Sequence, residues 1–219
     1  MAASRLSISE IPTVAALYRT ARLKPPKPDL ARRPASASLN DRVHLIRRDI
    51  TTLEVDAVVN AANRYLAGGG GVDGSIHRAA GPRLQAACDK LDGCPTGDAK
   101  MTPGFNLPAR YVIHAVGPRY GSGDTGKEEA LLRNCYTKSL TLAADHELTS
   151  VAFSCISTGI YGYPHEDAAH VAIGAVRKFM EERPEAVQHV VFVTFTTTDV
   201  ATYNEILPLY FPATEAEQQ

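Results

Sequence analysis

Two carboxamides and one carboxylate stand beside a run of glycines in the first half of the sequence. Asn60 and Asn63 follow the apolar residues 57–59, and Gly68–Gly71 lead into Asp73. A glycine-rich turn that opens a helix offers backbone N–H groups to an anion. These residues therefore predict an anion site with polar side chains beside it. The alternative is a plain connection in which Asp73 only caps the following helix.

A second loop of small polar residues follows the apolar run 151–156. Its Ser157, Thr158 and Gly159 offer hydroxyl and N–H donors to a phosphate, and Tyr161 either stacks on a sugar or base or is a core tyrosine. Both loops lie between an expected strand and an expected helix, where open α/β sheets bind ligands. Two such loops at one sheet edge suit a diphosphate. Neither matches the P-loop or the dinucleotide-binding pattern.

The elements that must position these loops alternate along the chain. Apolar runs of strand length alternate with segments whose apolar residues recur at helical spacing, which is typical of an α/β fold. We expect a mixed sheet between two helical layers, with strands at 43–48, 55–60, 111–116, 151–156 and 190–195 and helices at 74–91, 127–146, 165–182 and 199–207. No stretch approaches the roughly 18 apolar residues that a membrane span needs.

The first 39 residues differ in composition from the rest of the chain. Seven basic and two acidic residues give them a net charge of +5, whereas the whole chain of 219 residues carries −1. Prolines at 25–28 predict a linker with little helix after a short helix within 11–23. Such a segment is an ordinary arm, a mitochondrial transit peptide or a nucleic-acid contact, and the early Glu10 favours the arm. The polar residues 213–219 predict a disordered tail.

The cysteines give an indication of the compartment. None of the four forms a C-x-x-C pair, and they are scattered over expected helices and one strand as Cys88, Cys94, Cys135 and Cys155. This pattern indicates reduced thiols rather than a disulfide framework or a zinc site. We therefore expect an intracellular protein of the cytoplasm, the nucleus or both, with mitochondrial targeting by the extension left open.

The combined motifs resemble those of the macrodomains, and within them the MacroD type of mono-ADP-ribosylhydrolase. The resemblance is carried by Asp49-Ile50-Thr51 and by the segments 56–63, 68–74 and 156–162, and it extends over residues 40–212. It implies a three-layer α/β/α macrodomain at 40–212, between the extension 1–39 and the tail 213–219. It also implies a hydrolase that cleaves the ester between ADP-ribose and Asp or Glu side chains.

The resemblance also implies a role for each loop residue. Asp49 accepts a hydrogen bond from the adenine amino group with Ile50 beside it, and Phe195 stacks on the adenine. The diphosphate and the distal ribose lie between the two loops, with Tyr161 against the ribose. The ligand-binding residues expected on this basis are Asp49, Ile50, Gly69, Gly70, Gly71, Val72, Ser157, Thr158, Gly159, Ile160, Tyr161 and Phe195.

The catalytic residues implied by the resemblance are Asn60, Asn63 and Asp73. Asn63 hydrogen-bonds the distal ribose, Asn60 braces the loop, and Asp73 orients or deprotonates the attacking water. His77, one helical turn after Asp73, either supports the loop or is an ordinary buried histidine. A zinc-dependent branch of the family carries cysteine and histidine in this loop. Since no cysteine occurs here, we expect neither a metal nor a cofactor.

The expected partners follow from the same resemblance. They are ADP-ribose, mono-ADP-ribosylated proteins, O-acetyl-ADP-ribose and ADP-ribosylated nucleic-acid ends, bound by a monomer with no membrane contact. The main alternative is a module that binds ADP-ribose without cleaving it, but such readers tend to lack the Asn63 and Asp73 equivalents. A phosphatase acting on an ADP-ribose phosphate would use the same pocket.

Overall fold

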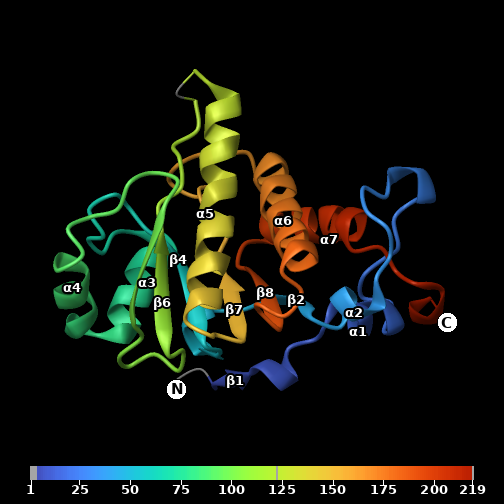
Figure 1. Cartoon of the computed structure of the whole chain (residues 1–219), viewed down its shortest axis with the longest axis horizontal. Coiled ribbons are helices and arrows are strands. Elements are labelled where there is room, and N and C mark those ends of the chain that lie inside the picture. The colour runs from blue at the N-terminus through green and yellow to red at the C-terminus, as the bar shows by residue number, and fades with distance from the viewer. Residues whose placement is uncertain (1–3, 122, 219) are drawn as a thin grey trace.

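A computed structural model describes residues 4–121 and 123–218, and its centre is one six-stranded sheet (Figure 1). Four neighbouring pairs run parallel and the last pair, at the β5 edge, runs antiparallel, so the expected mixed sheet is confirmed. The strands, in their order across the sheet, are β2 (Val43–Arg47), β8 (His189–Thr194), β7 (Ser150–Phe153), β4 (Ala57–Ala61), β6 (Tyr111–Ala115) and β5 (Ala99–Pro103).

Helices cover both faces of this sheet and complete the three layers. The helices α3 (Gly71–Ala80) and α4 (Pro82–Asp89) lie on one face. The other face carries α5 (Thr125–Asp145), α6 (His165–Glu182) and α7 (Thr197–Tyr210). Within the described residues, no helix combines the length and the apolar character needed to cross a bilayer.

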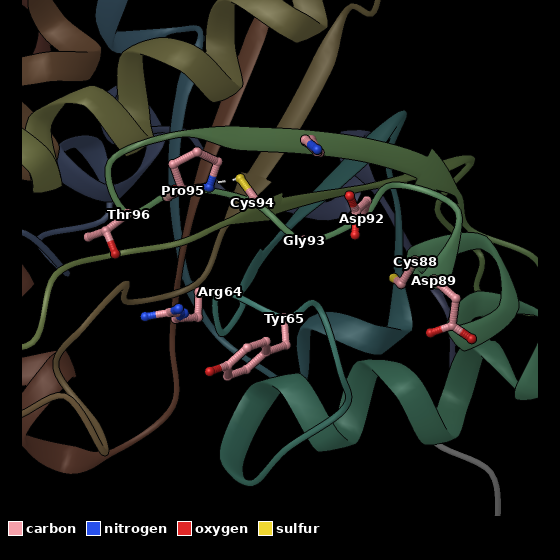
Figure 2. A pocket seen from close by; sticks show the side chains of 10 residues that line it. Arg64, Tyr65, Cys88, Asp89, Asp92, Gly93, Cys94, Pro95 and Thr96 are labelled. Atoms are coloured by element: carbon pink, nitrogen blue, oxygen red, sulfur yellow. Dashed lines mark hydrogen bonds between the residues drawn. The ribbon is translucent and has the colours of Figure 1, made fainter.

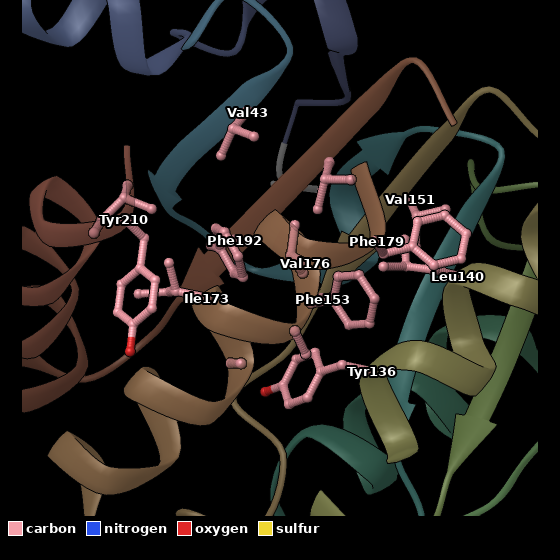
Figure 3. Packing of buried hydrophobic residues seen from close by; sticks show 14 of the residues in the cluster. Val43, Tyr136, Leu140, Val151, Phe153, Ile173, Val176, Phe179, Phe192 and Tyr210 are labelled. Atoms are coloured by element: carbon pink, nitrogen blue, oxygen red, sulfur yellow. The ribbon is translucent and has the colours of Figure 1, made fainter. Parts of the chain in front are cut away.

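Strand alternation divides the apolar residues between two cores. Val58 and Val112 face α3 and α4, whereas Val59 and Ile113 face α5 and α6, because successive side chains of a strand point to opposite faces. Both faces are buried, so these strands read as continuous apolar runs. Figure 3 shows the larger core, where Phe153 and Phe192 of the sheet lie among side chains of α5 and α6.

The structure corrects the expected helix at 74–91, which is two helices. The chain breaks at Gly81, whose φ is +82°, and a Cβ there would lie 2.7 Å from Nδ2 of Asn106. Pro82 then begins α4, a position that suits the fixed φ of proline. The adjacent Gly81 and Pro82 are a turn signal from which this break could have been predicted. The edge strand β5 was missed.

The N-terminal segment contributes to the core of the protein. Besides the short strand β1 (Leu6–Ser7), it forms the helix α1 (Val14–Arg19), within the range expected for a short helix. Val14 and Leu17 are buried against the sheet, and the hydroxyl of Tyr18 donates to the carbonyl of Phe211 at 2.9 Å. The boundary between an extension and the domain at residue 40 stays a prediction.

Short helical turns lie on both sides of α1 and near the end of the described chain. The segment contains η1 (Ile8–Glu10), η2 (Pro28–Leu30) and α2 (Ala37–Asn40), and the chain later forms η3 (Ile50–Thr52) with the two-residue strand β3 (Leu53–Glu54). The expected disordered tail is wrong for its described part, where η4 covers Glu215–Glu217. Glu217 is buried and accepts from Nδ2 of Asn40 at 2.8 Å, which anchors the C-terminus.

Candidate functional site

A continuous cleft lies at the carboxyl ends of β4, β7 and β8. Its inner cavity, of about 300 Å³, lies between the two glycine loops, and its outer cavity, of about 630 Å³, extends toward the end of β8. The two cavities meet where residues of both loops line each of them, namely Gly71, Val72, Cys155 and Gly159.

Asp73 lies in the first turn of α3, at the wall of the inner cavity. Its side chain is almost fully buried, yet both oxygens of its carboxylate accept hydrogen bonds from the protein. Nδ2 of Asn60 donates to one oxygen at 2.6 Å, and the backbone N–H of Gly69 donates to the other at 2.7 Å. The helix N-terminus adds a favourable dipole. Asp73 therefore anchors the glycine loop and presents a negative charge to the cavity.

The two asparagines both act on the loop, in different ways. Asn60 points from β4 into the buried layer below the cavity, where it holds Asp73. Asn63 lines the inner cavity, but its Oδ1 accepts from the N–H groups of Tyr65 at 3.1 Å and Ala67 at 3.3 Å, and its Nδ2 donates back to the Ala67 carbonyl. Asn63 thus closes its own loop, and its expected bond to a ribose stays a prediction.

His77 lies behind the loop rather than in the cavity. Its Nε2 is 3.5 Å from Oδ1 of Asp73. A Cβ at Gly68 would lie 2.9 Å from Cγ of His77, so only glycine lets the loop pass this close to the ring. The expected supporting role of His77 stays a prediction, beside the alternative of an ordinary buried histidine.

The second loop closes the opposite wall of the inner cavity. Ser157 adopts a φ of +68°, and its carbonyl accepts from the N–H of Tyr163 at 3.0 Å. A Cβ at Gly117 would overlap Oγ of Ser157, so the end of β6 requires glycine at this contact. Arg119 lies with its guanidinium carbon 4.8 Å from the centre of the Tyr161 ring and also lines this cavity.

The outer cavity has a flat, exposed end. Phe195 follows β8 with 71% of its surface exposed, and its N–H donates to Asp199 at 3.3 Å. Asp49 accepts from the N–H and the hydroxyl of Thr51, at 3.0 and 2.7 Å. Burial alone would raise the pKa of Asp199, but hydrogen bonds from Thr196 and Phe195 and the nearby His165 outweigh it and lower that pKa. The N-terminal cap of α7 therefore fixes the position of Phe195.

The structure brings the expected site residues together along one cleft. The inner cavity is lined by Asn63, Gly69, Gly70, Gly71, Val72, Asp73, Ser157, Gly159, Ile160 and Tyr161, and the outer cavity by Asp49, Ile50, Thr158 and Phe195. Asn60 and His77 lie behind them. Sequence reasoning missed Gly117, Arg119 and Arg48. The first two follow the strand 111–115, whose end could have been recognised as part of the same sheet edge.

One group of potential metal ligands lies below the site within the part of the chain that the structure describes. One ligand atom each from His77, Cys88 and His114 lies within 4.8 Å of the others. Burial, then Asp73 and Asp89, raise the pKa of Cys88 to about 11, whereas metals bind the thiolate. Both ring nitrogens of His114 already have hydrogen-bonding partners. The group is better suited to hydrogen bonding than to metal binding.

A larger cavity, of about 760 Å³, lies on another side of the loop that follows β4 (Figure 2). It is lined by Arg64, Tyr65, Cys88, Asp89, Asp92, Gly93, Cys94, Pro95, Thr96 and Lys100. Its cations and carboxylates are mixed, and neither glycine loop lines it. Burial is the main reason that the pKa of Cys94 is raised to about 11. The chemistry expected from the sequence therefore belongs to the two-part cleft.

Comparison with known proteins finds a matching family model and similar proteins. The model of the Macro domain family matches residues 59–172. The mouse protein "ADP-ribose glycohydrolase MACROD1" is 52% identical over 174 residues, which are 80% of this chain and 54% of that protein. The chain therefore spans about half the length of this curated relative. "Macro domain-containing protein CT2219" of Chlorobaculum tepidum is 52% identical over 77% of this chain and 96% of its own length.

A solved structure gives the same fold with a ligand. The Trypanosoma brucei macrodomain in complex with ADP-ribose superposes with a TM-score of 0.77 and 38% sequence identity. The match covers 91% of this chain and 75% of that one.

Proposed function

The chain belongs to the macrodomain family, and on this premise we propose that it is a hydrolase that removes mono-ADP-ribose from Asp and Glu side chains. The carrying observation is Asp73, held by Asn60 and Gly69 at the inner end of a cleft between two glycine loops. The name of the mouse relative, "ADP-ribose glycohydrolase", and the ADP-ribose complex of the trypanosome relative support the same activity and ligand.

The proposed ligand occupies the cleft from end to end. The adenine lies in the outer cavity against Phe195, with Asp49 accepting from its amino group. The diphosphate lies where the cavities join, at Gly71 and Gly159, because two loops of open backbone meet there and α3 begins at Gly71. The distal ribose then reaches the inner cavity. This order brings the ester on that ribose to Asp73.

The proposed reaction is attack of water on the acyl carbon of the ester. The new bond joins the water oxygen to the acyl carbon, and the ribose oxygen leaves and takes up a proton. Asp73 orients or deprotonates the water, which contributes about 10²–10⁴-fold as general base. Rigid placement of the diphosphate supplies the remaining rate enhancement, because it presents the ester to the water in one geometry. The products are ADP-ribose and a free carboxylate.

The same chemistry extends the proposal to other esters. O-Acetyl-ADP-ribose carries an acyl group on the same ribose, and we include its deacetylation and the release of ADP-ribose from nucleic-acid ends. We further propose that the protein acts as a monomer, without a cofactor, inside the cell. All four cysteines are free thiols in the structure, which supports the intracellular compartment.

The second candidate, a reader that binds without cleaving, is less well supported. A reader needs only the outer cavity and the diphosphate loops. Of the two hydrogen bonds to Asp73, that from Gly69 belongs to a diphosphate loop, whereas that from Asn60 comes from the buried layer below the cavity. A carboxylate that buried hydrogen bonds fix in one position is suited to orienting a water molecule for hydrolysis.

The test is release of labelled ADP-ribose from two substrates, one linked through glutamate and one through arginine. We expect release from the glutamate ester only, and inhibition by excess free ADP-ribose, since the product fills the same cleft. Tight ADP-ribose binding without release from the glutamate ester or from O-acetyl-ADP-ribose would favour the reader. Equal release from the arginine linkage would contradict acyl chemistry.

A further inference from the structure

Three neighbouring strands each supply one polar side chain to the same buried face of the sheet. They are Thr102 of β5, His114 of β6 and Asn60 of β4, and each is at most 3% exposed. Oγ1 of Thr102 is 3.0 Å from Nε2 of His114, and Nδ1 of His114 is 3.2 Å from Nδ2 of Asn60. The same Nδ2 donates to Asp73. A continuous buried chain of hydrogen bonds therefore connects the edge strand to the carboxylate.

The chemistry of the partners decides where the imidazole proton lies. The Asn60 amide nitrogen can only donate, so Nδ1 of His114 must accept. The proton is then on Nε2, which donates to the hydroxyl oxygen of Thr102. Burial, and then the neighbouring His77, lower the pKa of His114 to about 3, so the ring stays neutral and keeps its lone pair on Nδ1.

The orientation of the Asn60 amide follows from its contact with Asp73. Its two N–H bonds point at Asp73 and at His114. The reversed amide would set its oxygen against an oxygen of the Asp73 carboxylate, so acceptor would face acceptor, and the tautomer of His114 follows from the orientation that Asp73 selects. Among the described residues, Oδ1 of Asn60 has no hydrogen-bond partner. This arrangement is unfavourable for stability alone.

We propose that His114 and Thr102 are positioning residues for hydrolysis, which act by fixing the Asn60 amide and, through it, the carboxylate of Asp73. Neither residue lines the cleft, so neither contacts the substrate. The turnover part of this inference rests on the proposed function. Its effect should fall on kcat and leave ADP-ribose affinity unchanged, because the binding loops keep their own backbone contacts.

The first test compares two substitutions of His114. His114→Asn offers an amide oxygen near the position of Nδ1, whereas His114→Leu fills similar space with no acceptor. We expect the Leu variant to lose about 10- to 100-fold in kcat, as when a residue that orients a functional side chain is removed. The Asn variant should recover part of that loss. The Leu variant leaves a buried N–H of Asn60 without an acceptor, so it should also unfold at a lower temperature, and the recovery of kcat by the Asn variant carries the test.

The second test keeps the imidazole and removes its stronger acceptor, so that Nε2 retains only Sγ of Cys88, at 3.6 Å. Thr102→Val preserves shape, and we expect kcat to fall about 2- to 10-fold, the value of one hydrogen bond, with KM and ADP-ribose affinity unchanged. Ser139→Ala is the matched control. Its hydroxyl is also fully buried, but it donates to the carbonyl of Cys135 at 2.7 Å on the opposite face of the sheet. This control should keep the wild-type kcat.

A measurement without turnover separates this inference from the proposed function. Long-range ¹⁵N correlation spectra report which nitrogen of His114 carries the proton. We expect Nε2–H in the wild type and a mixture of both tautomers in Thr102→Val. An Nδ1–H wild type, or a Leu variant with wild-type kcat, would overturn the inference. A wild type that hydrolyses no ester but shows the Nε2–H tautomer would instead overturn the proposed function.

Discussion

The two ends of the cleft differ in burial and in the way that their functional side chains are held. At the inner end, Asp73 is 5% exposed and is held by a chain of buried hydrogen bonds that reaches back through three strands. At the outer end, Phe195 is 71% exposed and is positioned by a helix cap. Asp49 is likewise exposed, and its carboxylate accepts hydrogen bonds from Thr51 in its own turn.

On the proposed function, this difference separates the reaction at the inner end from ligand binding at the outer end. A carboxylate that must meet water in one geometry profits from a rigid, buried support. A flat aromatic surface for a base needs only to be present and accessible. Substitutions at the inner end should therefore change turnover, and substitutions at the outer end should change affinity.

The sharpest test of this separation is Asp73→Ala. We expect turnover of the glutamate ester to fall by about 10²–10⁴-fold, because the base or its water is lost. ADP-ribose affinity, measured by calorimetry, should stay within a few-fold, since the outer cavity is untouched. A variant that loses binding and turnover together would show that the inner end also holds the ligand.

The opposite result is expected for Phe195→Ala. Loss of a stacking partner for the base should weaken ADP-ribose binding by about 1–3 kcal/mol, and kcat at saturating substrate should be unchanged. Tyr65→Ala is a suitable control, because Tyr65 is 69% exposed but lies outside the cleft. Equal affinities of the Phe195 and Tyr65 variants in calorimetry would remove Phe195 from the adenine site.

Gly74→Ala tests whether the inner end is as rigid as its contacts indicate. A Cβ at Gly74 would overlap the carbonyl of Gly69, whose N–H holds Asp73. We expect overpacking to cost about 1–3 kcal/mol of unfolding free energy and to lower kcat. In Gly126→Ala, the control, the new Cβ would meet only Oδ1 of Asp124 at 3.7 Å. Thermal unfolding of both variants measures the contrast, and a Gly74 variant as stable as the control would indicate a loop that yields.

The last prediction concerns the pH dependence of stability. Burial holds the pKa of His114 at about 3 and, together with the neighbouring His189, that of His44 at about 4, although Ile11 opposes the shift of His44. The unfolded chain has a histidine pKa of about 6.5 and binds more protons below it, so stability falls as the pH falls. Between pH 7 and 5, His114 alone accounts for about 2 kcal/mol.

Urea unfolding at several pH values measures this slope. His114→Asn should flatten it, whereas replacement of the exposed His146 should not. An unchanged slope in His114→Asn would show that His114 takes up its proton in the folded protein as well. His114 would then not cause the loss of stability at low pH.

Much of the fold and most of the cleft could be predicted from local patterns. Apolar runs of strand length predicted the five strands of the six-stranded sheet other than β5, because strands buried on both faces need no polar alternation. Strand β5, at the sheet edge, carries Lys100 and Pro103 and lacks such a run. The N-terminal core residues were also missed, since their helix is only six residues long and lies among prolines and charges.

The sequence by itself determined the two loops and what they can bind. The glycines at 68–71, 159 and 162 favour turns through local sterics, because their backbone conformations depend mainly on neighbouring atoms along the chain. The tertiary structure alone decided which side chains meet across strands. Thr102, His114 and Asn60 are distant in sequence and become neighbours only through the strand order β5-β6-β4. That order follows from burying the apolar faces of the whole sheet, which no local pattern contains.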